Sequence, residues 1–272
     1  MNLAALLDIT DTVQYKIHAA RWNGIHNPLD VFLNNKDAWH DWNCYFGKKH
    51  EFNRPYVLAL ADFYPENHTW LFGGIYHVKN YNKRPPASAM ESHAYESELT
   101  DKGAELIGRL KIKVNFSRGR TFKLEGQIDK LILSEILPTS YTGPTFPGYD
   151  NASLSFSDLT SIAVNDRQDW KTALQNMKGI YLITLESGEN YVGSAYGDVG
   201  IWARWMAYVK TKDGGNKEMR KLNIATNGDY ITNARFTLIE SWPMRTDDKF
   251  IIARENYWKI ATSSRNNGLN HN

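Results

Sequence analysis

The last third of the chain holds residues of the types that phosphodiester hydrolysis requires. That reaction needs a group that takes a proton from the attacking water, a cation that binds the phosphate, and a cation or acid that neutralises the departing alkoxide. Phenols, a guanidinium and a carboxylate that holds a metal ion can supply these three functions. The candidate residues are Tyr181, Tyr191, Arg204, Tyr208 and Glu255.

Two strands are expected to position the first two tyrosines. Residues 179–185 (GIYLITL) and 189–195 (ENYVGSA) read as short strands, and the ESG between them is typical of a hairpin turn. On adjacent antiparallel strands, Tyr181 and Tyr191 can project from the same face into one pocket. A phenol with its ordinary pKa of ~10 is a poor base, but a nearby cation can lower that pKa.

A helix is expected to carry the arginine. Residues 200–210 (GIWARWMAYVK) have apolar positions at helical spacing, and Arg204 and Tyr208 lie four residues apart on one face. The planar guanidinium can bind the scissile phosphate and stabilise the charge of the transition state. Glu255 is the carboxylate assigned to a metal ion, because Mg²⁺ accepts one protein carboxylate and completes its shell with waters and phosphate oxygens.

Three further elements complete a small domain. A Gly-Gly break precedes a second helix that begins near Asn216, and residues 234–242 (ARFTLIESW) read as a third strand. Residues 247–262 read as a third helix, whose acidic first turn suits the helix dipole. The order β-β-α-α-β-α over residues 176–272 predicts an α/β sandwich with a three-stranded antiparallel sheet.

These residues, in this order, resemble the GIY-YIG nuclease family. The resemblance implies a metal-dependent DNA endonuclease that uses one Mg²⁺ or Mn²⁺ ion per active site. It implies that Arg204 binds the scissile phosphate and that Glu255 holds the metal. Tyr208 takes a position where the family has His or Tyr, and which phenol takes the water proton stays open. The matching residues are Gly179, Ile180, Tyr181, Tyr191, Val192 in place of the family's isoleucine, Gly193, Arg204, Tyr208, Gly215, Asn216, Glu255 and Asn270.

Asn270 lies fifteen residues after Glu255. It resembles a family asparagine that helps to position the phosphate or the active-site helix. We therefore count it with the catalytic residues.

The first 150 residues read as a mixed, strand-rich domain, so the fold class of the chain is α+β. Residues 54–64 and 69–78 are apolar runs separated by PENH, which predicts a hairpin. Residues 108–117 alternate apolar and polar side chains, with residues 121–126 as the expected antiparallel partner. Residues 129–137 can be a helix or a strand. The short strands resemble PUA-like barrels, a class that includes readers of modified bases.

A small catalytic module seldom selects its own target, so the first domain is expected to recognise double-stranded DNA. Its tryptophans can stack on a flipped base, although for each of them a place in the core is the favoured interpretation. Basic side chains in NFSRGR (residues 115–120) and KNYNKR (residues 79–84) suit phosphate contacts, although they can equally be solvated. The DNA-binding candidates are Trp22, Trp39, Trp42, Trp70, Arg118, Arg120, Asn216 and Lys217.

A connector is expected between the two domains. Residues 138–153 contain three prolines and two glycines, which is typical of a loop. Residues 151–175 read as two helical pieces with Ser157 and Asn165 as N-caps. The expected organisation is therefore a recognition domain (1–150), a helical connector (151–175) and a nuclease domain (176–272).

Composition favours a soluble, cytoplasmic protein. Hydrophobic residues make up 42% of the chain without a run long enough to span a membrane, and the N-terminus lacks the pattern of a signal peptide. Cys44 is the single cysteine, so no internal disulfide is expected and a core thiol is favoured over a nucleophile. No zinc-site spacing, P-loop or Gly-x-Ser-x-Gly motif occurs. A net charge of +2 is too small to establish a nucleic-acid partner.

Three functions remain open at this point. The leading one is a restriction endonuclease, with base reading by the first domain and dependence on a modified base as one form. The second is a repair or homing-type nicking nuclease. The third is a nucleic-acid-binding protein with an inert nuclease-like domain. Because double-strand cleavage needs two active sites or two visits, a homodimer on DNA is a further expectation.

Overall fold

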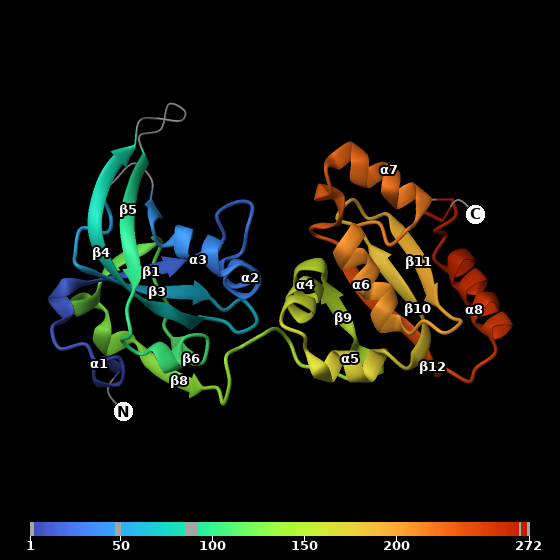
Figure 1. Ribbon diagram of the computed structural model, residues 1–272, viewed down its shortest axis with the longest axis horizontal. Coiled ribbons are helices and arrows are strands. Elements are labelled where there is room, and N and C mark those ends of the chain that lie inside the picture. The colour runs from blue at the N-terminus through green and yellow to red at the C-terminus, as the bar shows by residue number, and fades with distance from the viewer. Residues whose placement is uncertain (1–2, 47–49, 85–91, 267, 271–272) are drawn as a thin grey trace. The chain divides into compact units, whose positions relative to one another are not determined.

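The computed structural model describes residues 3–46, 50–84, 92–266 and 268–270. The chain divides into two compact units, Met1–Tyr141 and Thr142–Asn272 (Figure 1). In the part of the chain described, no helix is both long enough and apolar enough to cross a membrane.

The first unit is built on a sheet that has a parallel pair of strands near its centre. β1 (Tyr15–Ala20) runs parallel to β3 (Tyr56–Asp62), and β3 is antiparallel to β4 (Thr69–Arg84), which confirms the predicted hairpin. The main order is β2-β5-β4-β3-β1-β7, and β6 and β8 branch from β4. The remaining strands are β2 (Tyr45–Phe46), β5 (Ser92–Leu99), β6 (Leu110–Lys113), β7 (Thr121–Lys123) and β8 (Ile132–Ile136).

The expected pairing of residues 108–117 with residues 121–126 is wrong. β6 pairs with β4 and β8, whereas β7 pairs with β1. After β6 the chain buries Val114 and Phe116 in the core, so it does not turn back directly into a hairpin. The stretch that could be a helix or a strand forms β8.

Apolar clusters cover both faces of this sheet. Leu58 and Leu60 of β3 belong to one cluster, and the alternating Val57 and Ala59 belong to the other. Within the described residues, strand pairing stops at β7 and at β2 without joining these ends, so the PUA-like barrel stays a prediction. The helices are α1 (Leu3–Leu6), α2 (Pro28–Asn34) and α3 (Lys36–Trp42), with 3₁₀ turns at Thr12–Gln14, Ala104–Leu106, Leu124–Gly126 and Ile128–Lys130.

The second unit holds an antiparallel sheet with the order β11-β10-β12-β9. Three of these strands match the prediction, but β9 adds a fourth by pairing with β12, so the three-stranded sheet is wrong. Three helices lie where they were expected. The strands are β9 (Ser153–Ser155), β10 (Met177–Thr184), β11 (Asn190–Ala195) and β12 (Arg235–Pro243), the helices are α6 (Ile201–Thr211), α7 (Lys217–Thr226) and α8 (Asp248–Ala261), and 3₁₀ turns lie at Tyr149–Asn151 and Asp229–Ile231.

The segment expected to be a connector is part of the second unit. Its helices are α4 (Phe156–Val164) and α5 (Gln168–Leu174). Leu159 and Trp170 are fully buried in the same apolar cluster as side chains of β10, β11 and β12. Sequence patterning identified the helices but did not show that their apolar faces pack on this sheet.

The starts of these helices also differ from the prediction. Ser155, rather than Ser157, caps α4, and its hydroxyl and the Asp158 carboxylate form a reciprocal capping box. Asn165 ends α4 instead of starting α5, which follows Arg167.

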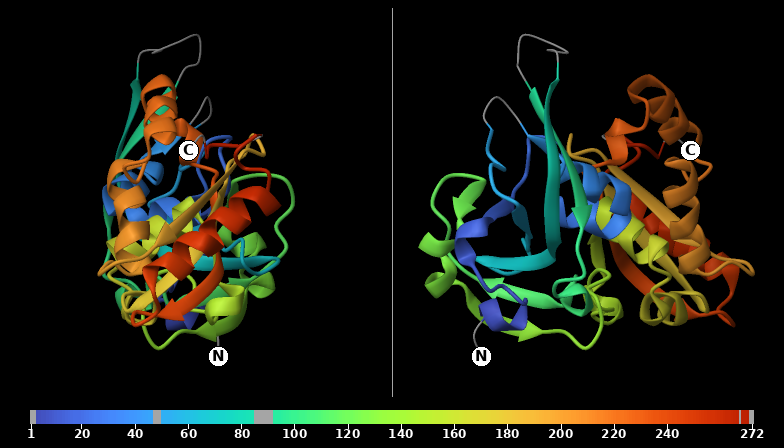
Figure 2. Two further views of the ribbon diagram at one scale, coloured as in Figure 1. Left: turned by 90° about the vertical axis from the view of Figure 1, so that its right-hand side faces the viewer. Right: turned by 60° about the vertical axis from the view of Figure 1, so that its left-hand side comes forward.

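Helices cover both faces of the four-stranded sheet. Tyr181 and Ile183 of β10 face the cluster that contains the buried side chains of α6. Ile180 of β10 and Val192 of β11 face the opposite side, where they pack with Ile251 of α8. Figure 1 shows α6 and α8 on opposite sides of the sheet, and Figure 2 shows the same layers from other directions.

Candidate active site

The two tyrosines of the paired strands project from one face, as predicted. Tyr181 lies opposite Gly193 in the β10–β11 ladder, and Tyr191 lies opposite Ile183. A Cβ atom at Gly193 would lie 2.4 Å from Cζ of Tyr181. The glycine of Tyr-Val-Gly therefore leaves room for the ring of Gly-Ile-Tyr, which explains why the two tripeptides occur together.

A hydrogen-bonded cluster holds the arginine in place. Arg204 Nε donates to the Tyr181 hydroxyl at 3.2 Å, and Nη1 donates to the Gly214 carbonyl at 3.0 Å. The Tyr181 and Tyr208 hydroxyls are 3.1 Å apart. Gly214 has φ +57°, and a Cβ there would lie 2.4 Å from Cε1 of Tyr208. The Gly-Gly break therefore lets the chain pass close to the tyrosine ring and present a carbonyl to the guanidinium.

Burial determines the protonation of two of the three candidate phenols, Tyr181 and Tyr208. Tyr181 and Tyr208 are fully buried. Burial raises the pKa of both, and the smaller opposing effect of Arg204 does not reverse the shift. Both phenols therefore stay protonated at neutral pH, where they orient the guanidinium and are unsuited to act as bases.

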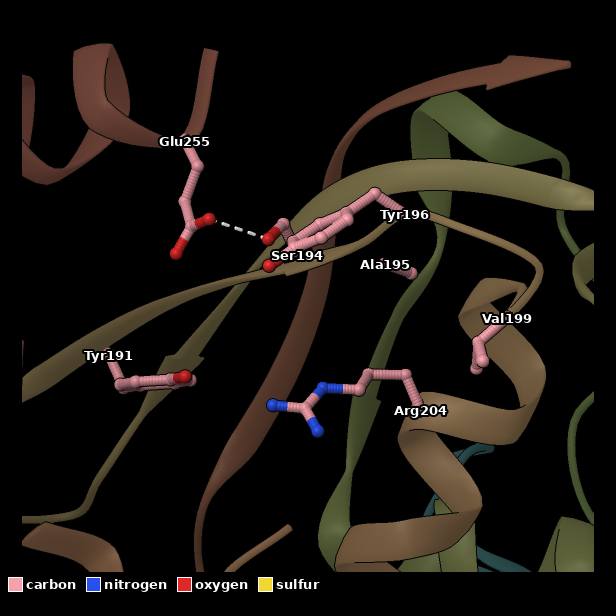
Figure 3. A pocket seen from close by; sticks show the side chains of 7 residues that line it. All are labelled: Tyr191, Ser194, Ala195, Tyr196, Val199, Arg204 and Glu255. Atoms are coloured by element: carbon pink, nitrogen blue, oxygen red, sulfur yellow. Dashed lines mark hydrogen bonds between the residues drawn. The ribbon is translucent and has the colours of Figure 1, made fainter. Parts of the chain in front are cut away.

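Three of the candidate residues meet in one pocket. The pocket has a volume of about 370 Å³ and lies at the β11 edge of the sheet. Figure 3 shows Arg204 reaching from α6 toward Tyr191, while Glu255 enters from α8. Tyr181 and Tyr208 lie behind Arg204 and do not line it. The lining residues are Tyr191, Ser194, Ala195, Tyr196, Val199, Arg204 and Glu255.

Two neighbours hold the glutamate. Ser194 Oγ donates to Glu255 Oε2 at 2.6 Å, and Lys259 Nζ lies 3.0 Å from Oε1. The Lys259 side chain is almost fully buried one helical turn after Glu255, so the ion pair is shielded from water. Both partners fix the carboxylate at the wall of the pocket.

The carboxylate fits a role as a metal ligand. A carboxylate offers about four lone-pair positions, and the two contacts to Glu255 leave others for a cation. Among the described residues, no group of three or more His, Cys, Asp and Glu side chains is placed to hold a metal ion. A cation here would therefore use Glu255 together with water and phosphate oxygens, which is a coordination that Mg²⁺ accepts.

The sequence did not single out three residues that shape this pocket: Ser194, Tyr196 and Lys259. Ser194 follows the Tyr-Val-Gly tripeptide, and strand alternation turns its side chain toward α8. That alternation was the available signal for Ser194. Lys259 stands four residues after Glu255, so helical spacing could have revealed it as a partner.

A charged contact anchors the loop that carries Tyr196. Asp248 Oδ1 accepts hydrogen bonds from the Gly197 backbone N–H at 3.0 Å and from Lys178 Nζ at 2.6 Å. The hydrogen bond from Lys178, followed by that from Gly197, lowers the pKa of Asp248. The loop after β11 is thus tied to the start of α8, the helix that presents Glu255.

Asn270 is buried away from the pocket lining and binds the edge strand. Its Oδ1 accepts from the Val192 N–H and its Nδ2 donates to the Val192 carbonyl, each at 2.8 Å. These bonds imitate a strand partner for β11. Asn270 therefore positions the strand between Tyr191 and Gly193, and its catalytic role remains a prediction.

The DNA-binding candidates fall into different environments. Trp39 is a core residue whose Nε1 donates to the Gly73 carbonyl at 3.0 Å, and Trp42 packs against it edge to face. Trp70 is 3% exposed and lines a second pocket, in the first unit. Trp22 is 61% exposed.

The polar candidates also differ in their surroundings. Arg118, Arg120 and Lys217 are exposed. The Asn216 side chain caps α7 by accepting from the Glu218 and Met219 N–H groups. Its amide oxygen therefore has a structural use.

Comparisons with known proteins give one partial likeness. No family model matches the chain, and no curated protein matches it. Among solved structures, the catalytic domain of intron endonuclease I-TevI, in a mutant form, is similar with 25% sequence identity and a TM-score of 0.29. The likeness covers 35% of this chain and 94% of that chain. At this TM-score it does not define the fold or the function of either unit.

Proposed function

We propose that the protein is a metal-dependent DNA endonuclease of the GIY-YIG type. The observation that carries the proposal is the meeting of Tyr191, Arg204 and Glu255 in one pocket at the β11 edge. A phosphate group bound there would contact a guanidinium on one side and face a carboxylate on the other (Figure 3). This is the arrangement that hydrolysis of a phosphodiester requires.

Arg204 is assigned to the phosphate. Its Nε and Nη1 are committed to Tyr181 and Gly214, which fixes the plane of the guanidinium. The remaining N–H groups can donate to a non-bridging phosphate oxygen. A guanidinium that is fixed before the substrate arrives stabilises the negative charge of the transition state without reorganising.

Tyr191 is assigned to the attacking water, because it is the one of the three phenols that lines the pocket. Its oxygen takes a proton from the water while its own phenolic proton passes to solvent, and the water oxygen then bonds to phosphorus. The bond from phosphorus to the leaving oxygen breaks, and that oxygen leaves with the electron pair and gains a proton from solvent. The buried Tyr181 and Tyr208 keep their protons throughout.

Glu255 is assigned to a single Mg²⁺ or Mn²⁺ ion. When bound, such an ion supplies charge neutralisation at the leaving oxygen. Ser194 and Lys259 orient the carboxylate, and their contacts hold it at the pocket wall.

Cleavage of plasmid DNA with Mg²⁺ present tests the proposal. The parent chain is expected to nick or linearise the plasmid, and Glu255→Gln is expected to reduce the rate by about a hundredfold or more, because the amide loses the charge that holds the cation. Glu105→Gln, the same change at an exposed residue of the first unit, is the matched control and should cut like the parent. A Glu255→Gln protein that cuts as fast as the parent would show that the metal assignment is wrong.

We further propose that this endonuclease is a restriction enzyme. The first unit is a separate compact body, and we assign target recognition to it. We propose double-stranded DNA as the substrate, base reading by the first unit, and a homodimer on the DNA that supplies two active sites.

Two experiments test this role. Digestion of plain, methylated and hydroxymethylated DNA, followed by sequencing of the ends, tests the target. Analytical ultracentrifugation with DNA tests the dimer. Nicks in one strand from a lone protomer would favour a repair or homing-type nicking enzyme.

A further inference from the structure

The first unit has a polar pocket at the carboxyl ends of its two parallel strands. Arg21 directly follows β1, and Asp62 is the last residue of β3, so the parallel pairing brings them to the same edge. The pocket has a volume of about 290 Å³, near the lower limit of ~300–1,000 Å³ for pockets that bind drug-sized ligands. It is lined by Arg21, Asp62, His68, Trp70, Val114, Asn115 and Phe116.

Arg21 is held from behind and keeps unused donors. Its Nη2 donates to the carbonyl oxygens of Phe116 at 3.2 Å and Ser117 at 3.3 Å. Its Cζ atom lies 5.3 Å from the centroid of the Trp70 ring, a cation–π contact. Within the described residues, no acceptor binds its Nε or Nη1, so these N–H groups are available to a ligand.

Asp62 is the acceptor beside this donor. The residue is partly buried, and none of the described residues donates a hydrogen bond to its carboxylate. Burial raises the pKa of Asp62, and the nearby Arg21 opposes the shift. A partly buried carboxylate that has lost some of its water and accepts no hydrogen bond from the protein can accept one from a ligand N–H group.

The two charges together select a class of ligand. Asp62 weakens the attraction of Arg21 for a phosphate, and Arg21 weakens the attraction of Asp62 for a divalent cation. A neutral, flat molecule with hydrogen-bond donors next to acceptors would satisfy both side chains. The edge of a nucleobase has this pattern, with N–H donors adjacent to ring nitrogen or carbonyl acceptors.

We propose that this pocket binds an unpaired nucleobase, with Arg21 donating to acceptors of the base and Asp62 accepting from its N–H groups. The proposal rests on the proposed function to the extent that the base belongs to the DNA substrate. The exposed Arg118 and Arg120 follow Phe116 in the chain and can contact the phosphates that flank such a base. The base would have to leave its stack to enter the pocket.

NMR of tryptophan side chains in the full chain tests the proposal without relying on cleavage. The chain has nine tryptophans, and a Trp70→Phe variant identifies the indole N–H signal of Trp70, which donates to the Val114 carbonyl beside the pocket. We expect at least one of the four deoxynucleosides to shift this signal. Asp62→Asn should weaken that binding about tenfold or more, because a charged acceptor is lost.

Two controls define the site. Asp129→Asn, at an exposed residue of the same unit, should bind the nucleoside like the parent. Deoxyribose 5-phosphate, which lacks a base, should leave the Trp70 signal unchanged. A shift caused by the sugar phosphate, or no shift with any nucleoside, would overturn the proposal.

Fluorescence anisotropy then links the pocket to DNA. The parent should bind a duplex with one unpaired nucleotide more tightly than the fully paired duplex, and Asp62→Asn should lose that preference. Equal binding of both duplexes by the parent would also overturn the proposal. If nucleosides bind while no DNA is cut, the proposed nuclease function fails and the pocket assignment survives. If DNA is cut but no nucleoside shifts the Trp70 signal and the parent shows no preference for the unpaired nucleotide, the pocket assignment fails and the nuclease proposal survives.

Discussion

The two units each place an arginine, a carboxylate and an aromatic side chain around a pocket, but they arrange the charges differently. In the second unit, Arg204 is held by tyrosine and carbonyl oxygens, and Glu255 is held by Ser194 and Lys259. No ion pair joins Arg204 to another described residue. In the first unit, Arg21 and Asp62 line the same pocket, and the charge of Arg21 opposes the rise in the pKa of Asp62 that burial causes.

The groups that hold a charged side chain determine which ligand that side chain can bind. In the second unit, Arg204 and Glu255 are held by different neighbours. In the proposed site the guanidinium is therefore free to bind a phosphate, and the carboxylate is free to bind a cation. The opposite charges of Arg21 and Asp62 line one pocket of the first unit, which is why we assign a neutral ligand to it. Residue types alone therefore do not define a site, because the two pockets have similar compositions.

The largest expected effect comes from removing the guanidinium of Arg204, which forms no ion pair with another described residue. Arg204→Ala should lower the single-turnover rate of DNA cleavage about 100–1,000-fold, because the guanidinium stabilises charge that develops in the transition state. DNA affinity, measured by anisotropy, should change far less. Arg245→Ala, at an exposed position, is the control. Equal losses of affinity and rate would mean that Arg204 only binds the substrate.

The second effect separates the phenol in the pocket from the phenol behind it. Tyr191→Phe should reduce cleavage about 100-fold, since it removes the proposed proton acceptor. Tyr181→Phe should reduce it only about tenfold, because it removes one hydrogen bond that orients Arg204. Single-turnover rates of both variants decide the order. A larger loss in Tyr181→Phe would transfer the proton-accepting role to the buried tyrosine.

The third effect concerns the space beside Gly193 that the ring of Tyr181 occupies. Gly193→Ala places a Cβ against Tyr181 and should lower the free energy of unfolding by about 1–3 kcal/mol. Urea unfolding measures this loss. Gly126→Ala is the control, because a Cβ there meets nothing within 4 Å. Equal stabilities of the two variants would show that the ring moves aside without cost.

The smallest expected effect is the contribution of Asp169 to the pH dependence of folding stability. Burial favours a higher pKa for Asp169, but the Arg167 hydrogen bonds and the Phe146 N–H outweigh it and lower the pKa to about 2. Because the folded pKa is depressed, this stabilisation is present above the ordinary value of 3.8 and is lost as the pH falls toward 2. Thermal unfolding of Asp169→Asn between pH 2 and pH 7 should therefore show a weaker pH dependence than the parent. Parallel curves would contradict the assignment.

Much of the second unit could be predicted from the sequence because its signals are local. Strand alternation and helical spacing located the elements that carry Tyr181, Tyr191 and Arg204, and their shared face follows from the hairpin. The fourth strand was missed because Ser153–Ser155 is too short to show a period. Its identity as a strand depends on pairing with β12, which is distant in the sequence.

The first unit was harder to predict because its pairings are non-local. β1 and β3 are parallel and separated by two helices, so no turn signal connects them. The pocket of Arg21 and Asp62 depends on that pairing and could not be seen in the sequence. Trp39 and Trp70 illustrate the same limit, since composition alone did not distinguish a core ring from a pocket wall.

The contacts of Asn270 also affect how the molecule behaves in solution. Its side chain binds both backbone groups of Val192, and Leu269 N–H donates to the Asn190 carbonyl at 2.9 Å, so residues 268–270 cover an outer sheet edge. An uncovered edge strand is a template for pairing with other chains and for aggregation. Deleting these residues would expose that template, so the shortened protein should be prone to self-association even where the side chains that line the β11 pocket remain intact.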